Sequence, residues 1–306
     1  MNHFCIIGLG ETGASVAAIL IEKHPGCRID IIDPSDWIKG RFLDLAHAAV
    51  MNCCEFELNN YEAANTSDII FYCAGIRNEK GGDRLSVVQE NKKLIPIVFE
   101  YFSFSPNALI IVITNPVELI AQWISEYYNH QVHVIGTGTA LDQFRLHYIL
   151  SKKLSVPVDK IEVSVIGEHG NAMIPVYSQG KVDGVSIETL LSEEEREEIT
   201  KELVASASKI RETEEATKYG VAQCAIVIAD AWGSKEDIQL PVSVHIDDKL
   251  AAALHINKHS FLSFPCIFQN KTINLISTLD INSIEKEQLK KAALKLMQIN
   301  QSVENV

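Results

Sequence analysis

The feature that most constrains the fold lies at the start of the chain. Residues 4–7 form a short apolar run, and the glycine pattern GLGETG follows directly at residues 8–13, ahead of a helix-like apolar pattern. In a strand–turn–helix unit of this kind, Gly8 allows the tight turn, Gly10 lets the backbone approach a pyrophosphate, and Gly13 permits close packing of the helix against the strand. The pattern therefore predicts a dinucleotide-binding βαβ unit.

A carboxylate further along strengthens that interpretation, because GxGxxG alone also occurs in ordinary glycine turns. A second strand-like run at residues 28–32 ends in Asp33, twenty residues after Gly13. A ribose-binding carboxylate is expected at this spacing. Asp33 can accept hydrogen bonds from the ribose hydroxyls of NAD and would repel the 2′-phosphate of NADP. We therefore expect NAD as the cofactor.

Strand-like and helix-like segments alternate through the first 139 residues, which we take as one domain. Further strands are expected at residues 55–58, 68–73, 109–113 and 132–135, and helices at residues 40–52, from about 85 to 101, and at 117–128. Such alternation predicts an α/β fold, a Rossmann doubly wound parallel sheet with helices on both faces. Ligands bind at the carboxyl ends of the strands in folds of this class.

The pattern changes from residue 140 onward, and residues 140–306 are expected to form an α+β catalytic domain with antiparallel strands and no intervening linker. Strands are predicted at residues 160–166, 175–179, 240–246 and 261–268, and helices at 141–153, from Ser192 onward, at 219–231 and at 283–301. Ser192 is a good N-cap, followed by acidic residues that suit the first turn of a helix.

Composition excludes several classes of function. The formal net charge of −13 argues against nucleic-acid binding, which needs a basic surface. No apolar run reaches the length of about 18 residues typical of a membrane span, and we expect no signal peptide. The seven cysteines include no CxxC pair and indicate free thiols in the cytoplasm. His255 and His259 lie four residues apart but lack a third ligand in register, so no metal is expected.

A set of chemically complementary residues lies in the second half. His169 stands between two glycines in the sequence GEHG (residues 167–170), and Asp142 and Arg145 lie one helical turn apart upstream. Histidine exchanges protons near neutral pH, a carboxylate orients an imidazole and raises its pKa, and arginine binds a carboxylate by two parallel hydrogen bonds. The alternative is a surface ion pair on a helix beside a loop histidine.

Taken in order, these motifs resemble the NAD-dependent lactate/malate dehydrogenase family along essentially the whole chain, with the closest likeness to L-lactate and L-2-hydroxyisocaproate dehydrogenases. The blocks that carry the resemblance are Gly8–Gly13, Asp33, Ala74-Gly75 with the loop to Arg84, residues 114–117, residues 135–142 with Arg145, Gly167–Gly170, and Thr217.

The resemblance implies hydride transfer between NAD(H) and a small L-2-hydroxy acid or 2-oxo acid, as in glycolysis. It implies that His169 is the proton donor oriented by Asp142, that Arg84 polarises the substrate carbonyl, and that Arg145 binds the substrate carboxylate. Asn115 is expected beside both nicotinamide and substrate, and Ala74 and Gly75 beside the cofactor. It also implies a homo-oligomer, a dimer or a tetramer.

The residues expected around the variable end of the substrate bear on which acid is bound. The resemblance aligns Asn78 and Thr217 with positions that line the substrate pocket. Asn78 is neutral and short, which favours lactate/pyruvate or a slightly larger 2-hydroxy acid, because a second carboxylate would lack a charge partner. Arg77 is adjacent, and if it faces inward instead, malate becomes the substrate. A hypothesis of another class is a non-catalytic NAD-binding sensor or scaffold.

Overall fold

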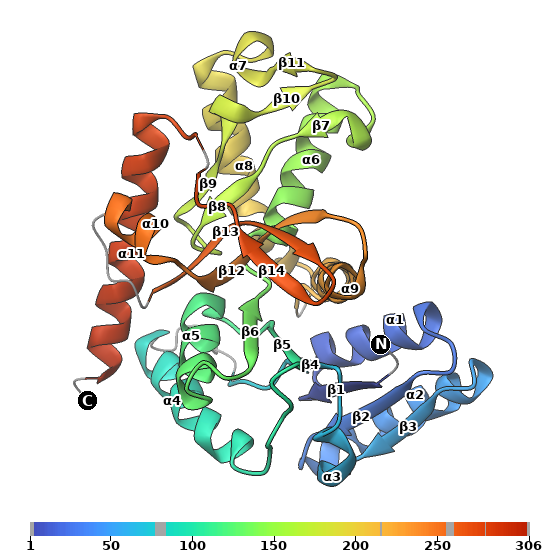
Figure 1. Cartoon of the computed structure of the whole chain (residues 1–306). Coiled ribbons are helices and arrows are strands. Elements are labelled where there is room, and N and C mark those ends of the chain that lie inside the picture. Colours follow the sequence, from blue (N-terminus) through green and yellow to red (C-terminus); the bar gives the residue numbers. More distant parts are fainter. Residues whose placement is uncertain (1–2, 77–83, 215, 255–259, 279, 305–306) are drawn as a thin grey trace.

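The computed structural model describes residues 3–76, 84–214, 216–254, 260–278 and 280–304. Its first half alternates strands and helices, and its second half begins at the helix that follows the sixth strand (Figure 1). The elements of the first half are β1 (His3–Ile7), α1 (Glu11–Lys23), β2 (Arg28–Ile32), α2 (Lys39–Met51), β3 (Glu55–Leu58), α3 (Tyr61–Ala64), β4 (Ile69–Tyr72), α4 (Arg84–Phe99), β5 (Leu109–Val112), α5 (Val117–Tyr127) and β6 (His133–Gly136).

The second half mixes short strands with long helices. Its elements are α6 (Ala140–Leu154), β7 (Ile161–Glu162), β8 (Val165–Gly167), β9 (Met173–Pro175), β10 (Lys181–Val182), β11 (Val185–Ser186), α7 (Ile187–Leu190), α8 (Glu193–Arg211), α9 (Tyr219–Gly233), β12 (Ile238–His245), α10 (Asp248–Leu254), β13 (Phe261–Gln269), β14 (Thr272–Leu275) and α11 (Ser283–Glu304). None of the helices in the described ranges is both long and apolar enough to cross a membrane.

The first six strands form a parallel sheet in the order β3-β2-β1-β4-β5-β6. This is the predicted doubly wound arrangement, and the direction of winding reverses between β1 and β4. The carboxyl ends of these two strands therefore form the crevice where ligands of this fold bind.

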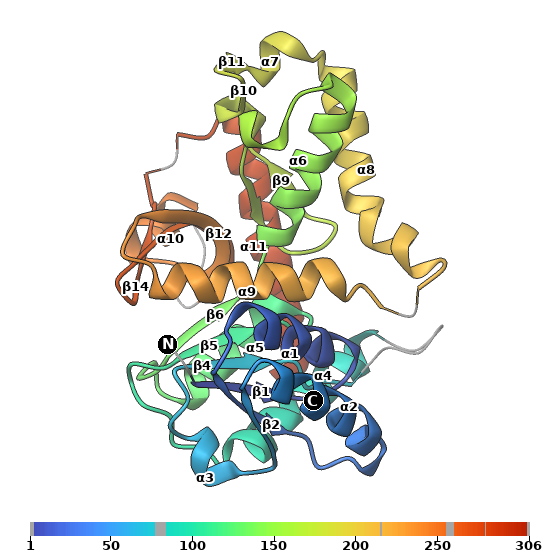
Figure 2. The same cartoon turned by 90° about the vertical axis from the view of Figure 1, so that its right-hand side faces the viewer.

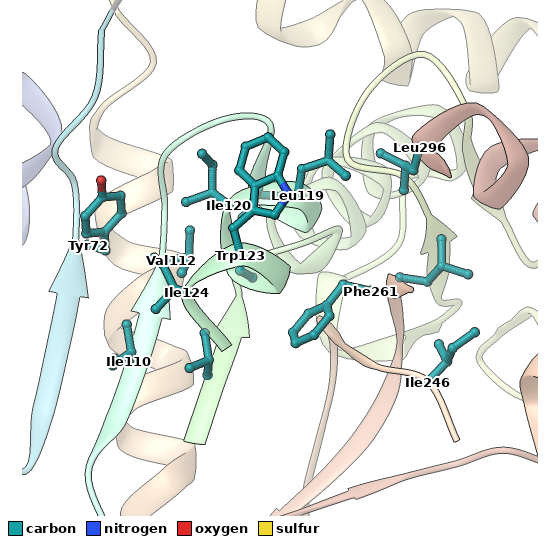
Figure 3. Close-up of a cluster of buried hydrophobic side chains, with 14 of the residues drawn as sticks. Tyr72, Ile110, Val112, Leu119, Ile120, Trp123, Ile124, Ile246, Phe261 and Leu296 are labelled. Carbon is teal, nitrogen blue, oxygen red and sulfur yellow. The ribbon is translucent and has the colours of Figure 1, made fainter. Parts of the chain in front are cut away.

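The central strands carry apolar side chains on both faces of this sheet, which explains why helices cover both faces. On β5, Ile110 and Val112 belong to the core shared with α4 and α5, while Leu109 and Ile111 belong to the core shared with α1 and α9. Successive side chains of a strand point to opposite faces, so both sets must be apolar. Figure 3 shows part of the first of these cores, to which Trp123 of α5 belongs.

The sheet does not end with the first half. Strand β12 pairs antiparallel with β6 through Ser243 and Gly136, and it pairs along its whole length with β13. Helix α9 lies across the middle of the molecule, against α1 (Figure 2). The expected antiparallel strands are therefore present, and no linker separates the two halves.

Two strand predictions in the second half were wrong. The segment 160–166 is two strands in different sheets, since β7 pairs with β10 and β8 pairs with β9 and β13. The segment 175–179 is mostly not a strand, because β9 ends at Pro175 and Tyr177–Gln179 is a 3₁₀ turn. Both segments mix apolar and polar residues as strands do, and that pattern alone does not indicate where a strand ends or changes sheet.

Candidate active site

His169 lies in the turn that leaves β8. Gly167, the last residue of that strand, has φ +96°, a left-handed conformation that glycine adopts without strain. The chain then turns so that Nδ1 of His169 lies 2.6 Å from Oδ2 of Asp142. An imidazole from β8 and a carboxylate from α6 are thus in direct hydrogen-bond contact.

The first turn of α6 is fixed to the strand that carries the histidine. Thr139, the N-cap of α6, donates its hydroxyl to the carbonyl of Val165 on β8. Its main-chain N–H donates to Oγ of Ser263 on β13, at 2.8 Å. Because both bonds are buried, they set the position of Asp142, three residues into α6, relative to β8.

Arg145 follows Asp142 by one helical turn and shares its carboxylate. Nη1 of Arg145 donates to Oδ1 of Asp142 at 3.0 Å, while His169 takes the other oxygen. The Asp142 side chain has no solvent exposure, whereas those of Arg145 and His169 keep 15% and 22% exposed. The basic groups are therefore the ones that a bound molecule can reach.

The charges alter the proton affinities of these groups. Burial alone would lower the pKa of His169, but the charge and hydrogen bond of Asp142, together with the charge of Glu118, outweigh burial and raise that pKa above the ordinary value for histidine. Burial alone would raise the pKa of Asp142, but the His169 imidazole and the Arg145 guanidinium hold it below its usual range. The pair is therefore expected to hold an imidazolium beside a carboxylate near neutral pH.

Sequence reasoning missed a second buried carboxylate behind the histidine. Oε1 of Glu118, in the first turn of α5, accepts the main-chain N–H of His169 at 3.0 Å and the hydroxyl of Ser243 at 2.9 Å. The signal available in the sequence was an acidic residue inside an otherwise apolar helical run. Its approach to His169 depends on tertiary structure, which that signal does not contain.

The glycine turn after β1 has the geometry that a dinucleotide requires. Gly8 has φ +95°, and a Cβ there would lie 2.7 Å from the main-chain nitrogen of Ala74, across the crevice between β1 and β4. Asp33 directly follows β2, where its Oδ2 accepts the N–H of Leu9 at 2.8 Å and its Oδ1 accepts the N–H of Ser35 at 3.0 Å. A carboxylate has about four acceptor sites, so Asp33 can still accept from ribose hydroxyls.

Gly13 and Gly10 differ in the space that surrounds them. A Cβ at residue 13 would lie 2.0 Å from the carbonyl oxygen of Gly8, so only glycine lets α1 pack this close to the turn. A Cβ at residue 10 would meet no described atom within 4 Å. Gly10 is also the N-cap of α1 and makes no side-chain capping bond. Among the described residues there is thus room beside Gly10 at the N-terminus of α1, where an anion is favoured.

The crevice continues along the ends of β4 and β5. The hydroxyl of Thr114 donates to the carbonyl of Ala74 at 2.8 Å, which joins the two strand ends. A Cβ at Gly75 would overlap the Thr114 side chain. Asn115 is exposed immediately after Thr114 and precedes a cis peptide bond to Pro116. Asn115, Ala74 and Gly75 therefore lie together just beyond the carboxyl ends of β4 and β5.

Other predicted site residues are not brought to the cluster by any described contact. Asn78 and Arg77 lie outside the described residues, and Arg84 is described only as the first residue of α4, without its side chain. Thr217 is half-buried just before α9, a helix that packs against α6.

No set of three or more His, Cys, Asp and Glu side chains among the described residues is arranged to hold a metal ion. His255 and His259 lie outside the described residues.

Comparison with protein families gives two matches that together span nearly the whole chain. Residues 2–136 match the family model described as the lactate/malate dehydrogenase NAD binding domain. Residues 139–306 match the model described as the lactate/malate dehydrogenase alpha/beta C-terminal domain.

Individual relatives agree with these matches. The chain is 30% identical to an L-lactate dehydrogenase of Bacillus licheniformis, over 96% of this chain and 94% of the relative. It is 28% identical to an L-lactate dehydrogenase of Halalkalibacterium halodurans, over 99% of this chain and 97% of the relative. Among solved structures, the minor L-lactate dehydrogenase of Enterococcus mundtii has the same fold, with a TM-score of 0.85, 23% identity, and coverage of 99% of this chain and 98% of that chain.

Proposed function

The chain belongs to the lactate/malate dehydrogenase family, and from this premise we propose that it interconverts a small L-2-hydroxy acid and the corresponding 2-oxo acid, with L-lactate and pyruvate or a slightly larger pair as substrates. The observation that carries the proposal is the buried Asp142 carboxylate, which contacts His169 at 2.6 Å and Arg145 at 3.0 Å. The names of the relatives support the lactate assignment.

NAD is the cofactor, and when bound it supplies or accepts the hydride. Gly8, Gly10 and Gly13 would hold its pyrophosphate at the N-terminus of α1, and Asp33 would accept from its ribose. Ala74, Gly75 and Asn115 would line the crevice on the other side. These positions support NAD rather than NADP, because a 2′-phosphate would be repelled by the Asp33 carboxylate.

His169 is the proposed proton donor. Its Nδ1–H donates to Asp142, which leaves Nε2 to face the substrate. Negative charge develops on the carbonyl oxygen as a 2-oxo acid is reduced, and a proton delivered there by Nε2 neutralises it. In the reverse direction the same nitrogen takes the hydroxyl proton. The raised pKa of His169 keeps that proton available near neutral pH.

The two arginines have separate proposed roles. Arg145 would bind the substrate carboxylate as a bidentate fork, using the N–H groups that do not contact Asp142. Arg84 would polarise the carbonyl from the start of α4. A single donor to developing oxyanion charge contributes about 3–4 kcal/mol to transition-state stabilisation.

Asn78 and Thr217 are proposed to line the variable end of the substrate. A neutral residue at position 78 leaves no charge partner for a second carboxylate, which disfavours oxaloacetate.

A substrate panel tests the proposal. We would compare kcat/KM for pyruvate, 2-oxo-4-methylpentanoate and oxaloacetate by following NADH oxidation. The expected result is a preference for one of the two monocarboxylates. A clear preference for oxaloacetate would assign the chain to the malate branch, and no turnover of any 2-oxo acid would favour a binding protein without catalysis.

We further propose that residues 1–139 and 140–306 act as cofactor and substrate units of a cytoplasmic homo-oligomer. All seven cysteines are unpaired, as is usual in a reducing compartment. Helix α2 has one buried residue, Ala49, and exposes Leu43, Val50 and Met51. Val50 and Met51 are 74% and 80% exposed, which is unusual for neighbouring apolar side chains unless a second subunit covers them.

A further inference from the structure

Glu118 is an ionisable residue in an environment that disfavours its charged form. It is 1% exposed and lies in the first turn of α5, where residues 117–125 are all buried. Removing an ionised carboxylate from water costs several kcal/mol unless hydrogen bonds and opposite charges compensate. A buried acid at this position therefore needs a physical reason.

The compensation comes from two donors that converge on one oxygen. Oε1 of Glu118 accepts the main-chain N–H of His169 at 3.0 Å and the Oγ–H of Ser243 at 2.9 Å. Ser243 lies on β12, opposite Gly136 of β6. One carboxylate thus connects α5, the β12 strand and the turn that carries the proton donor. The bond to His169 is to its main chain, so the ring stays free to titrate.

Several charged groups surround the His169 imidazole. From α6, Asp142 raises its pKa and Arg145 lowers it, and from α5 Glu118 raises it. The Cys224 thiol of α9 interacts electrostatically with Asp142 and Arg145.

The neighbouring Glu168 is paired with Lys295 of α11, whose Nζ lies 2.7 Å from Oε2 of Glu168. Much of its charge is therefore compensated locally. Asp142 and Glu118 are the two carboxylates that stabilise the imidazolium.

Burial raises the pKa of Glu118 above the ordinary value for glutamate, and the His169 charge and the two donated hydrogen bonds, which favour the ionised form, offset only part of that rise. The imidazolium and this carboxylate therefore stabilise each other, because each lowers the free energy of the other's charged state.

We propose that Glu118 is a positioning residue for the reaction, which fixes the main chain of His169 through its N–H and adds a second negative charge behind the imidazolium that Asp142 faces. The inference rests on the proposed role of His169 as proton donor. The competing interpretation is a purely structural one, in which Glu118 only joins α5 to β12 through Ser243. The two differ in whether the charge of Glu118 affects the proton affinity of His169.

The Glu118→Gln variant distinguishes the two interpretations, because glutamine has a side chain of the same length and keeps an acceptor oxygen but carries no charge. We expect the descending limb of kcat/KM for pyruvate against pH to shift to lower pH by about one unit, because the imidazolium loses a stabilising charge. Direct NMR titration of His169 in the cofactor-free protein should show the same shift. The matched control is Glu126→Gln, at an exposed position on the same helix, and it should leave both readouts unchanged.

Ser243→Ala provides a second variant should Glu118→Gln fail to fold. It removes one donor from Oε1, makes the anion of Glu118 less stable, and should lower the pKa of His169 by a smaller amount.

A His169 titration identical to wild type in folded Glu118→Gln, or in Ser243→Ala if that variant alone folds, would overturn the inference and leave Glu118 a structural residue. Absence of turnover in the wild-type protein would instead contradict the proposed function. The NMR titration would still decide the role of Glu118, because it needs neither cofactor nor substrate.

Discussion

Asp142 is the residue on which the proposed chemistry depends most. It is fully buried, and its two oxygens accept from different basic groups, Nδ1 of His169 and Nη1 of Arg145. A buried acid with two charged partners stabilises the fold as well as the imidazolium, and the two effects have different pH dependences.

Asp142→Asn should therefore reduce stability in a defined pH window. The lowered pKa of Asp142 contributes stability above the ordinary pKa of Asp, about 3.9, and that contribution is lost as pH falls. The raised pKa of His169 contributes below about 6.5 and is lost as pH rises through the folded-state value. The loss of unfolding free energy should be greatest between about pH 4 and 6.5, at about 3 kcal/mol.

Urea denaturation at a series of pH values measures this difference between wild type and Asp142→Asn. A loss that is constant from pH 4 to pH 9 would show that the carboxylate contributes no charge interaction with His169.

Arg145→Lys tests the substrate clamp. Lysine keeps the charge but cannot form two parallel hydrogen bonds to a carboxylate. We expect KM for the 2-oxo acid to rise about 10- to 100-fold, as loss of a charged hydrogen bond of about 1.5–3 kcal/mol implies, with NADH affinity unchanged. Arg196→Lys on α8 is the control, because that guanidinium donates to Leu191 in a different part of the fold. An unchanged KM would remove Arg145 from the proposed site.

Individual residues also show which parts of the candidate site could be predicted from the sequence. His169, Asp142 and Arg145 could be named because they occur in recognisable spacings, and the structure brings the three into contact. Glu118 could not, because its importance comes from burial and from an N–H supplied by a residue 51 positions away. Asn78 lies outside the described residues, so its proposed role rests on the resemblance alone.

At the scale of elements, two glycines in the turn between β1 and α1 have clearly different surroundings. The positions of Gly13 and Gly10 differ in what a methyl group would meet, an oxygen at 2.0 Å in one case and no described atom within 4 Å in the other. The first glycine is required by packing within the protein, and the second is expected to be required by the cofactor.

Gly13→Ala should destabilise the protein by about 1–3 kcal/mol and also weaken NADH binding, since α1 must move away from the turn. Gly10→Ala should unfold at the wild-type temperature and weaken NADH binding only. Thermal unfolding together with NADH fluorescence titration measures both properties. Wild-type NADH affinity in Gly10→Ala would contradict the proposed pyrophosphate site.

Most elements of the first half were predictable, because strands such as β4 and β5 are continuous apolar runs buried on both faces and the longer helices have an apolar side that covers them, but the short helix α3 was not predicted. Ser192 was also recognised as an N-cap, and the structure has a full capping box with Glu195. The short strands after α6 were not predictable to the same degree. Strands β7 and β8 are two and three residues long, and what separates them is pairing with different sheets, which depends on long-range contacts.

At the scale of the whole molecule, the net charge is negative, whereas the side chains proposed to bind the substrate are basic. The chain carries a formal net charge of −13, yet the proposed substrate is an anion. Attraction must therefore be local, and we expect it to come from the Arg145 and His169 groups, which remain partly exposed. Composition argued against nucleic acid as a partner, but it could not locate the site.

The exposed face of α2 predicts self-association. Introducing charge with the double substitution Leu43→Glu and Val50→Glu should convert an oligomer into a folded monomer, because desolvated carboxylates would oppose the contact. Analytical ultracentrifugation measures the mass, and Leu190→Glu on α7, an exposed apolar residue on another face, is the control. A wild-type protein that is monomeric at micromolar concentration would contradict this assignment.

The most direct test of the whole account is the His169→Asn variant. Asparagine can still donate a hydrogen bond but cannot act as an acid near neutral pH, so the account predicts wild-type NADH binding together with a fall in kcat for 2-oxo acid reduction of about 10²–10⁴-fold. Turnover close to that of wild type, with NADH bound normally, would show that the proton comes from elsewhere and would contradict the account.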